Sequence, residues 1–191
     1  MTFEDLKIIF PDATLETWHV HQNGGGWVQN TATVTDSAYV GPDAIVSGSA
    51  SVSGKAHISE NAWVFGKAQV SGNALVYEYV QISGDARVSG DARVSGSAIV
   101  SGDARVSGTA SVSGTAWVGG EAQVSGSAWV GGEARVFENA QVFDDAKVFD
   151  ESIVSGRSMV AGNAMVYGDA QVSGRSLVFG DTVVSGNKII D

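Results

Sequence analysis

Residues able to do chemistry are few in this 191-residue sequence, and histidine is the scarcest of them. The three histidines are His19, His21 and His57, and there is no cysteine, so thiolate nucleophiles and thiolate metal ligands are excluded. His19 and His21 are two residues apart, which puts both on one side of a strand at a spacing usable by zinc ligands. We prefer the simpler interpretation of two surface histidines beside Gln22. We predict no catalytic residue, no metal ligand and no cofactor.

Carboxylates are the more abundant reactive groups. The 21 acidic residues outnumber the 11 basic ones, for a net charge of -10. This balance argues against direct binding to nucleic acid or to anionic membranes, which both attract Lys and Arg. The many serines recur as fillers of a repeat, and no Ser-His-Asp arrangement can be built convincingly from so few histidines.

Acidic and aromatic residues are concentrated between residues 121 and 151, a segment that contains seven acidic and two basic residues. We define a candidate binding belt there, comprising Glu133, Phe137, Glu138, Phe143, Asp144, Phe149, Asp150 and Glu151. The belt could bind a basic protein, or hold a weak Ca²⁺ site of paired carboxylates, although no calcium-loop spacing is present. A DNA-mimic inhibitor of a host protein is a further alternative. The plainest interpretation is a solvated acidic corner with Phe packed over the strand.

The element that must position these residues is a six-residue repeat. From residue 25 to residue 186 the chain divides into 27 hexads without insertion or deletion. The fourth position is always Val or Ile, the second is Ala in 21 hexads, and the sixth is Gly in 19. The exceptions at the second position are Gly26, Val80, Ser152, Ser158, Ser176 and Thr182. Two inward residues alternating with polar ones predict a short strand, and Gly predicts a turn directly after it.

A unit this short cannot bury its own apolar side, so the copies must stack. The motif V-S-G-D-A-R, as at residues 100–105 with Ser and Gly between Val100 and Asp103, resembles the hexapeptide of left-handed parallel β-helix proteins. The resemblance implies three hexads per triangular coil, hence about nine coils in an all-β, single-stranded left-handed parallel β-helix. The start of the repeat, G-G-W-V at residues 25–28, also resembles hexapeptide-repeat proteins of phages and prophages, a likeness that implies no activity.

Many enzymes of the hexapeptide class are acyltransferases that use acyl-CoA, with a catalytic His on a loop that projects from a coil. This chain has no projecting loop, and His57 is the only histidine within the array. An acyltransferase with His57 as its base is therefore the alternative, and a non-catalytic structural protein is preferred.

The chain is expected to have two parts, an N-terminal cap over residues 1–24 and the repeat array over residues 25–191. Thr2 and Asp5 predict a capping box for a short helix through Phe10, which Pro11 would stop. Residues 14–22 read as a strand that covers the open first coil. The last residues, including Lys188 and Asp191, either form a charged end or dock on another molecule.

The third position of each hexad points outward, and sorting the hexads by threes gives three rows. One row contains six large apolar residues, which we predict to form an interface: Trp27, Ile45, Trp63, Ile99, Trp117 and Ile153. Exposed apolar patches on a rigid face are typical of association surfaces. The resemblance suggests a homotrimer. The alternative is that broad side chains merely cover the sheet, where β-propensity favours them.

No signal peptide and no membrane-length apolar run is recognisable in the sequence. We therefore expect a cytoplasmic or virion-associated protein. Its expected role is that of a rigid, oligomeric structural or protein-interaction module, whose partners are copies of itself and a host or virion protein.

Overall fold

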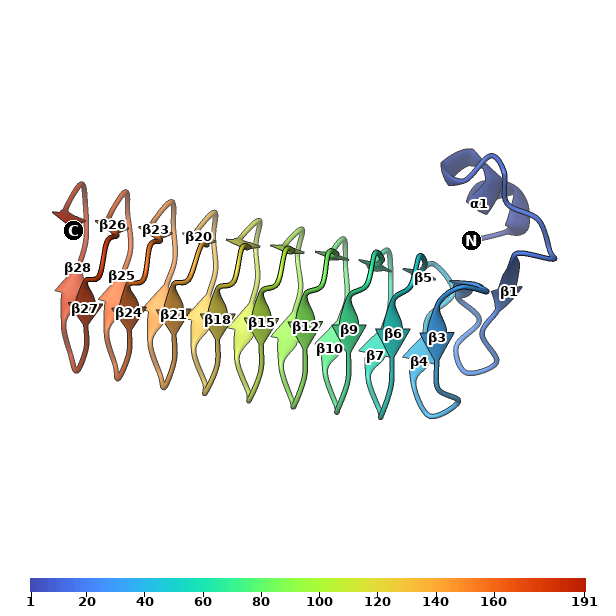
Figure 1. Cartoon of the computed structure of the whole chain (residues 1–191), viewed down its shortest axis with the longest axis horizontal. Coiled ribbons are helices and arrows are strands. Elements are labelled where there is room, and N and C mark those ends of the chain that lie inside the picture. Colours follow the sequence, from blue (N-terminus) through green and yellow to red (C-terminus); the bar gives the residue numbers. More distant parts are fainter.

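The chain forms a straight rod in which the repeat winds into one coil after another (Figure 1). The computed structural model describes residues 1–191, and its strands form three sheets that run along the rod. The strands within each sheet are parallel, apart from the first strand of the chain. The predicted all-β parallel solenoid of about nine turns, with one short N-terminal helix, is therefore confirmed. The left hand implied by the resemblance stays a prediction.

We call the three sheets faces A, B and C. Face A contains β1 (Trp18–Val20), β2 (Trp27–Gln29), β5 (Ile45–Val46), β8 (Trp63–Val64), β11 (Gln81–Ile82), β14 (Ile99–Val100), β17 (Trp117–Val118), β20 (Arg135–Val136), β23 (Ile153–Val154), β26 (Gln171–Val172) and β29 (Ile189–Ile190). Face B contains β3 (Thr33–Val34), β6 (Ser51–Val52), β9 (Gln69–Val70), β12 (Arg87–Val88), β15 (Arg105–Val106), β18 (Gln123–Val124), β21 (Gln141–Val142), β24 (Met159–Val160) and β27 (Leu177–Val178). Face C contains β4 (Tyr39–Val40), β7 (His57–Ile58), β10 (Leu75–Val76), β13 (Arg93–Val94), β16 (Ser111–Val112), β19 (Trp129–Val130), β22 (Lys147–Val148), β25 (Met165–Val166) and β28 (Val183–Val184).

The register between coils is the same along the rod. Leu75 pairs with Arg93 and Val76 with Val94, so residues 18 apart in sequence lie side by side. The amide of Leu75 donates to the carbonyl of Ala92 at 2.9 Å, and this pattern repeats in the other coils. Side chains of one row are therefore separated by one inter-strand spacing of about 4.8 Å.

The interior is narrow because each strand is only two residues long before the chain turns. It accommodates one small and one β-branched side chain per hexad. The Ala and Val residues at these positions are almost completely buried, apart from the partly buried Ala32 and Val34. Three hexads carry a serine at the small position instead. The hydroxyls of Ser152, Ser158 and Ser176 each donate to the carbonyl three residues earlier, at 2.8, 2.7 and 2.6 Å. These bonds let a polar group occupy the core without losing its hydrogen bond.

The turns explain the glycine at the sixth position. Gly96 has a φ of +75°, in the left-handed region, and a Cβ there would lie 2.4 Å from the carbonyl oxygen of Gly114 in the next coil. Both the backbone conformation and the close stacking of turns therefore favour glycine. Five acidic residues adopt the same conformation at this position: Glu60, Glu78, Glu138, Asp144 and Asp150.

The N-terminal segment contains the predicted helix and a shorter strand than predicted. Helix α1 (Phe3–Ile9) begins with the expected capping box, in which the amide of Asp5 donates to the Thr2 hydroxyl at 3.2 Å. The strand β1 covers only Trp18–Val20, because the amide of Thr17 bonds the carbonyl of Thr14 at 3.1 Å and closes a turn there. β1 pairs antiparallel with β2 and so covers the first edge of face A.

Candidate binding surfaces

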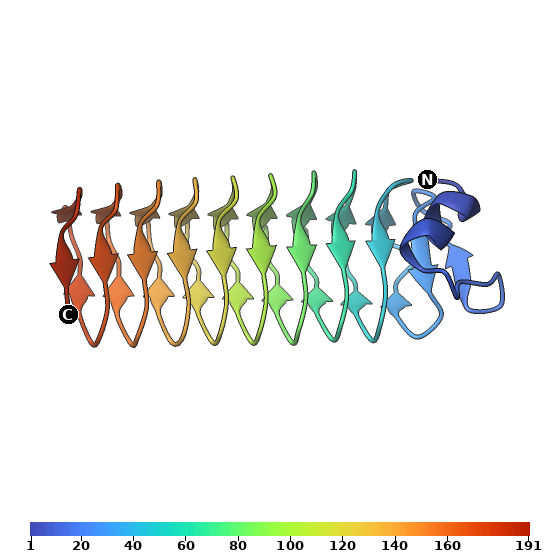
Figure 2. The same ribbon diagram turned by 90° about the horizontal axis from the view of Figure 1, so that it is seen from above.

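The predicted interface row lies along face A, and the N-terminal segment covers its first part. Trp27 and Ile45 are each only 5% exposed. They form a small apolar cluster outside the rod with residues of the N-terminal segment, namely Leu6, Ala13 and Trp18, while Met1, Phe3, Phe10 and Trp63 pack around it. Figure 2 shows α1 lying against the first coils of the rod. These members of the row are therefore occupied by the chain itself.

Aromatic contacts hold the segment in place. The Phe3 and Trp27 rings are 5.4 Å apart, and Phe10 meets Trp63 edge-on at 5.5 Å. The indole N–H of Trp27 donates to the carbonyl of Met1 at 3.2 Å. The N-terminal ammonium also pairs with the Asp43 carboxylate. Sequence reasoning predicted the cap but missed its position over face A, although the aromatic residues of both parts were a signal.

The uncovered part of the row consists of Ile99, Trp117 and Ile153. Trp117 is 37% exposed and lies along the rod. Its indole N–H donates to the hydroxyl of Ser101 in the preceding coil at 2.9 Å, and its ring stacks on Phe137 in the following coil at 5.6 Å. The indole therefore stabilises three successive coils and still presents one edge to solvent.

A glycine two residues after the tryptophan leaves free the space that the indole occupies. Trp63 makes the same kind of bond, to the Ser47 hydroxyl at 2.9 Å, with Phe65 at that position and its ring centroid 4.4 Å away. A Cβ on Gly119 would lie 2.7 Å from Cε2 of Trp117, and one on Gly131 would lie 2.5 Å from Cζ2 of Trp129. Trp129 repeats the arrangement two hexads later, at another corner, where its indole N–H donates to the Ser113 hydroxyl at 2.9 Å. The motif Trp-Val-Gly thus marks an indole folded flat over its own strand, a signal present in the sequence but missed.

Three carboxylates of the belt bind backbone amides of the next coil. Glu138 Oε2 accepts from the amide of Gly156 at 2.6 Å, Asp144 Oδ2 from Gly162 at 3.2 Å, and Asp150 Oδ2 from Gly168 at 3.1 Å. Each acid occupies a left-handed turn position 18 residues before the glycine that it bonds. These three residues therefore have a structural role in joining consecutive turns.

The other belt carboxylates, Glu133 and Glu151, lie in adjacent coils. With Arg135 and Ile153 they line a shallow depression on face A. The one ion pair in the structure joins the N-terminus to Asp43, so no Lys or Arg of the chain pairs directly with these acids. Like charges one coil apart repel each other. This corner thus keeps a negative charge that a cationic partner could neutralise.

The belt phenylalanines differ in their surroundings. Phe137 stacks on Trp117, and Phe149 lies between Trp129 at 5.5 Å and Tyr167 at 5.0 Å. Phe143 makes no aromatic contact of this kind. Two of the three rings are thus parts of aromatic stacks that fill corners of the rod, and Phe143 is the one left without a stacked ring.

The three histidines have separate partners. His19 Nδ1 lies 2.6 Å from Asn30 Oδ1, and buried His21 lies with Nε2 3.1 Å from the Ala38 carbonyl oxygen. His57 stacks on Tyr39 with ring centroids 4.1 Å apart. No group of three His, Asp or Glu side chains is arranged to hold a metal ion. His57, the base of the acyltransferase alternative, lines none of the surface depressions.

Comparison with known proteins agrees with the coil architecture. A family model for the YdcK beta solenoid repeat matches residues 68–84, 80–96, 86–102 and 160–174. These segments of the chain are thus similar to that solenoid repeat, and together they make up a minor part of the chain. No curated protein matches the chain. The structure contains no helix long and apolar enough to cross a membrane.

Proposed function

We propose that this protein is a non-catalytic, rigid β-solenoid that binds other proteins through its flat faces. The observation that carries this proposal is the unbroken register, in which outward side chains of successive coils form straight rows without a projecting loop. Such rows present binding groups at fixed spacing, and little ordering entropy is lost when a partner binds to them. By resemblance, a phage or prophage setting is part of the proposal, with a role in the virion or against a host protein.

Self-association is the first interaction that we propose. The uncovered part of face A offers Ile99, Trp117 and Ile153 on a rigid sheet, and we expect a homotrimer through this surface. Sedimentation at micromolar concentration tests it. A species of 19.7 kDa, the mass of one chain, would overturn self-association. Ile99→Lys together with Ile153→Lys should convert the oligomer to that monomer, whereas Gln69→Lys with Gln123→Lys on face B should not.

Binding of a basic protein to the belt is the second interaction. The support is the set of belt carboxylates without a cationic partner in the chain. A fluorescein-labelled hexalysine peptide is a suitable probe. Glu133→Gln with Glu151→Gln removes two negative charges from the belt and should weaken peptide binding. The fold should be unaffected, because these two acids do not join consecutive turns. Asp85→Asn with Asp103→Asn removes the same charge elsewhere and is the matched control. Equal weakening by both pairs would show attraction to net charge alone and contradict a belt.

A further inference from the structure

The corner between faces B and C carries a column of side chains in which one ring is missing. Phe143, Ala161 and Phe179 follow one another at intervals of 18 residues. The strands that precede them are in register, with Val142 paired to Val160 and Val160 paired to Val178. The two phenylalanines therefore flank a single alanine and lie two coils, or about 9.6 Å, apart.

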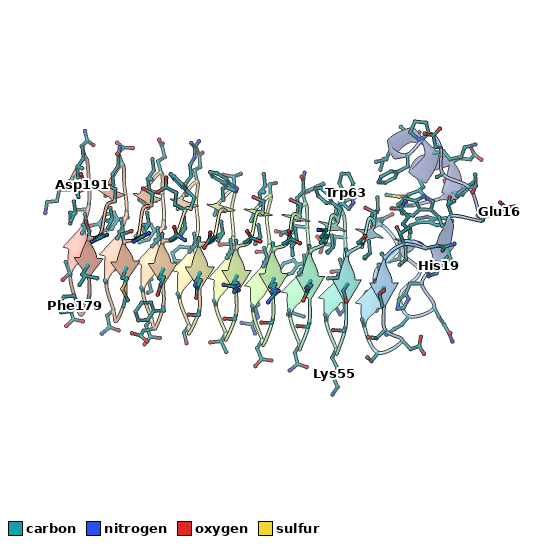
Figure 3. The ribbon with its side chains drawn as sticks, in the orientation of Figure 1. Glu16, His19, Lys55, Trp63, Phe179 and Asp191 are labelled. Atoms are coloured by element: carbon teal, nitrogen blue, oxygen red, sulfur yellow. The ribbon has the colours of Figure 1, made fainter.

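The space over the alanine is an apolar slot of about 250 Å³, lined by Phe143, Met159, Ala161, Leu177, Val178 and Phe179. Ala161 is its floor and is only 9% exposed, whereas Phe179 forms an open wall that is 68% exposed. Figure 3 labels Phe179 on this corner, near the last coils of the rod.

The neighbouring corner shows what fits into such a space. There Trp129, Phe149 and Tyr167 form a continuous stack, with centroid distances of 5.5 and 5.0 Å. One ring per coil is thus compatible with the coil spacing of this fold. The slot has a ring on each side and lacks the middle one, so its width suits one planar aromatic ring.

Charge around the slot indicates what accompanies that ring. The turns that follow the column carry Asp144, Asp145 and Asp181 and no basic residue. None of these carboxylates is in an ion pair. The basic residues nearest in sequence are four residues from the column, at most roughly 13 Å along an extended chain. They are Arg157 and Arg175, in the turns before β24 and β27, and Lys147 in β22. The nearest charges therefore favour a cationic neighbour for the bound ring.

We infer that the slot binds an aromatic side chain from a basic segment of a partner protein, held between Phe143 and Phe179. This inference rests on the proposed function and specifies it further, because Phe143 and Asp144 belong to the belt. A bound ring would complete the stack and bury Ala161, while Lys or Arg beside it would meet the carboxylates of the turns. Buried aromatic anchors of this kind dominate protein interfaces.

A fluorescein-labelled peptide, Gly-Lys-Phe-Lys-Gly-Lys, tests the slot by fluorescence anisotropy. Ala161→Phe fills the slot with the chain's own ring and should weaken binding about tenfold. Ser89→Phe places the same ring in the same column four coils earlier and should leave binding unchanged. Phe179→Ala removes the open wall and should also weaken binding. The peptide with Ala in place of Phe should bind the unmodified protein about as weakly as the Phe peptide binds the filled variant.

The results separate this inference from the proposed function. Equal binding of the Phe and Ala peptides, or equal affinity of the unmodified protein and Ala161→Phe, overturns the slot. If the slot is overturned in this way but peptide binding is lost in Glu133→Gln with Glu151→Gln, the proposed binding to the belt holds and only the slot is wrong. If neither peptide binds, both are wrong. Should Ala161→Phe fold poorly by circular dichroism, the comparison of the two peptides and Phe179→Ala still decide the question.

Discussion

The carboxylate of Glu138 accepts a hydrogen bond from the backbone N–H of Gly156 in the next coil, with 2.6 Å between the two heavy atoms. Glu138 has a φ of +59°, which costs a residue with a Cβ roughly 1–2 kcal/mol relative to glycine. The hydrogen bond offsets part of this cost, since the amide at that turn has no other partner. An unfavourable turn residue is thus compensated by a contact 18 residues away.

This relationship predicts that two small substitutions of Glu138 differ in their effect on stability. Glu138→Ala keeps the left-handed conformation and loses the hydrogen bond, so it should destabilise the fold by about 1 kcal/mol. Glu138→Gly loses the same bond but removes the strain, so it should be nearly neutral. Guanidinium denaturation of both variants measures the difference. Equal destabilisation by the two variants would show that strain is unimportant here.

The flat indole of Trp117 occupies the space that a side chain at Gly119 would need. Gly119→Ser, which restores the commonest residue of the fifth position, should cost about 1–3 kcal/mol because its Cβ overlaps the indole. Adding Trp117→Gln should remove most of that cost. The double-mutant cycle should therefore give a coupling energy above about 0.5 kcal/mol. Strictly additive effects of the two substitutions would contradict this packing.

Leu6 anchors the N-terminal segment on face A. It is fully buried, and Leu6→Ala should weaken docking of the segment by about 2–5 kcal/mol while the rod stays folded. The readout is quenching of Trp27 and Trp63 by acrylamide, which should increase. Ile8→Ala, on the exposed side of the same helix, is the control and should change nothing. Loss of the β-sheet circular dichroism signal in Leu6→Ala would contradict independent docking.

Acid should release the same segment. Hydrogen bonds from the Thr2 hydroxyl and the Thr2 backbone N–H hold the pKa of Asp5 below its ordinary value of 3.8. Because the folded pKa is depressed, the stabilisation is fully present above the unfolded pKa and is lost as pH falls through the folded pKa. Quenching of Trp27 should therefore rise on acidification below about pH 4. Asp5→Asn should flatten that part of the profile, and an unchanged profile would count against the capping box.

The repeat was predictable because its pattern is local. The hexad pattern indicates which side chains point inward, namely Ala at the second position and Val at the fourth. Gly at the sixth position indicates where the chain turns. A fixed spacing of 18 residues then assigns every outward residue to its row, and the three predicted rows correspond to faces A, B and C. The capping box at Thr2 and Asp5 was equally legible, since its hydrogen bonds lie within one helical turn.

Other features depend on contacts between coils or on the path of the N-terminal segment. The sequence marks Trp27 and Ile45 as outward and apolar, but it does not state that the chain's own helix covers them. Likewise the sequence identifies Glu138 only as one acid of the belt. Its hydrogen-bond partner, the amide of Gly156, lies beside it only because the chain coils.

The amino-acid sequence by itself determines the coil, its register and its almost invariant interior, because each six-residue unit repeats the same pattern of inward residues and turn residue. The tertiary structure alone decides which outward residues of the face A row and of the belt remain available to a partner. It folds the helix over Trp27 and Ile45, lays Trp117 flat, ties Glu138 to the next turn and leaves a vacant space between Phe143 and Phe179. These outcomes depend on how side chains pack across coils and against the docked segment, information that no single hexad contains.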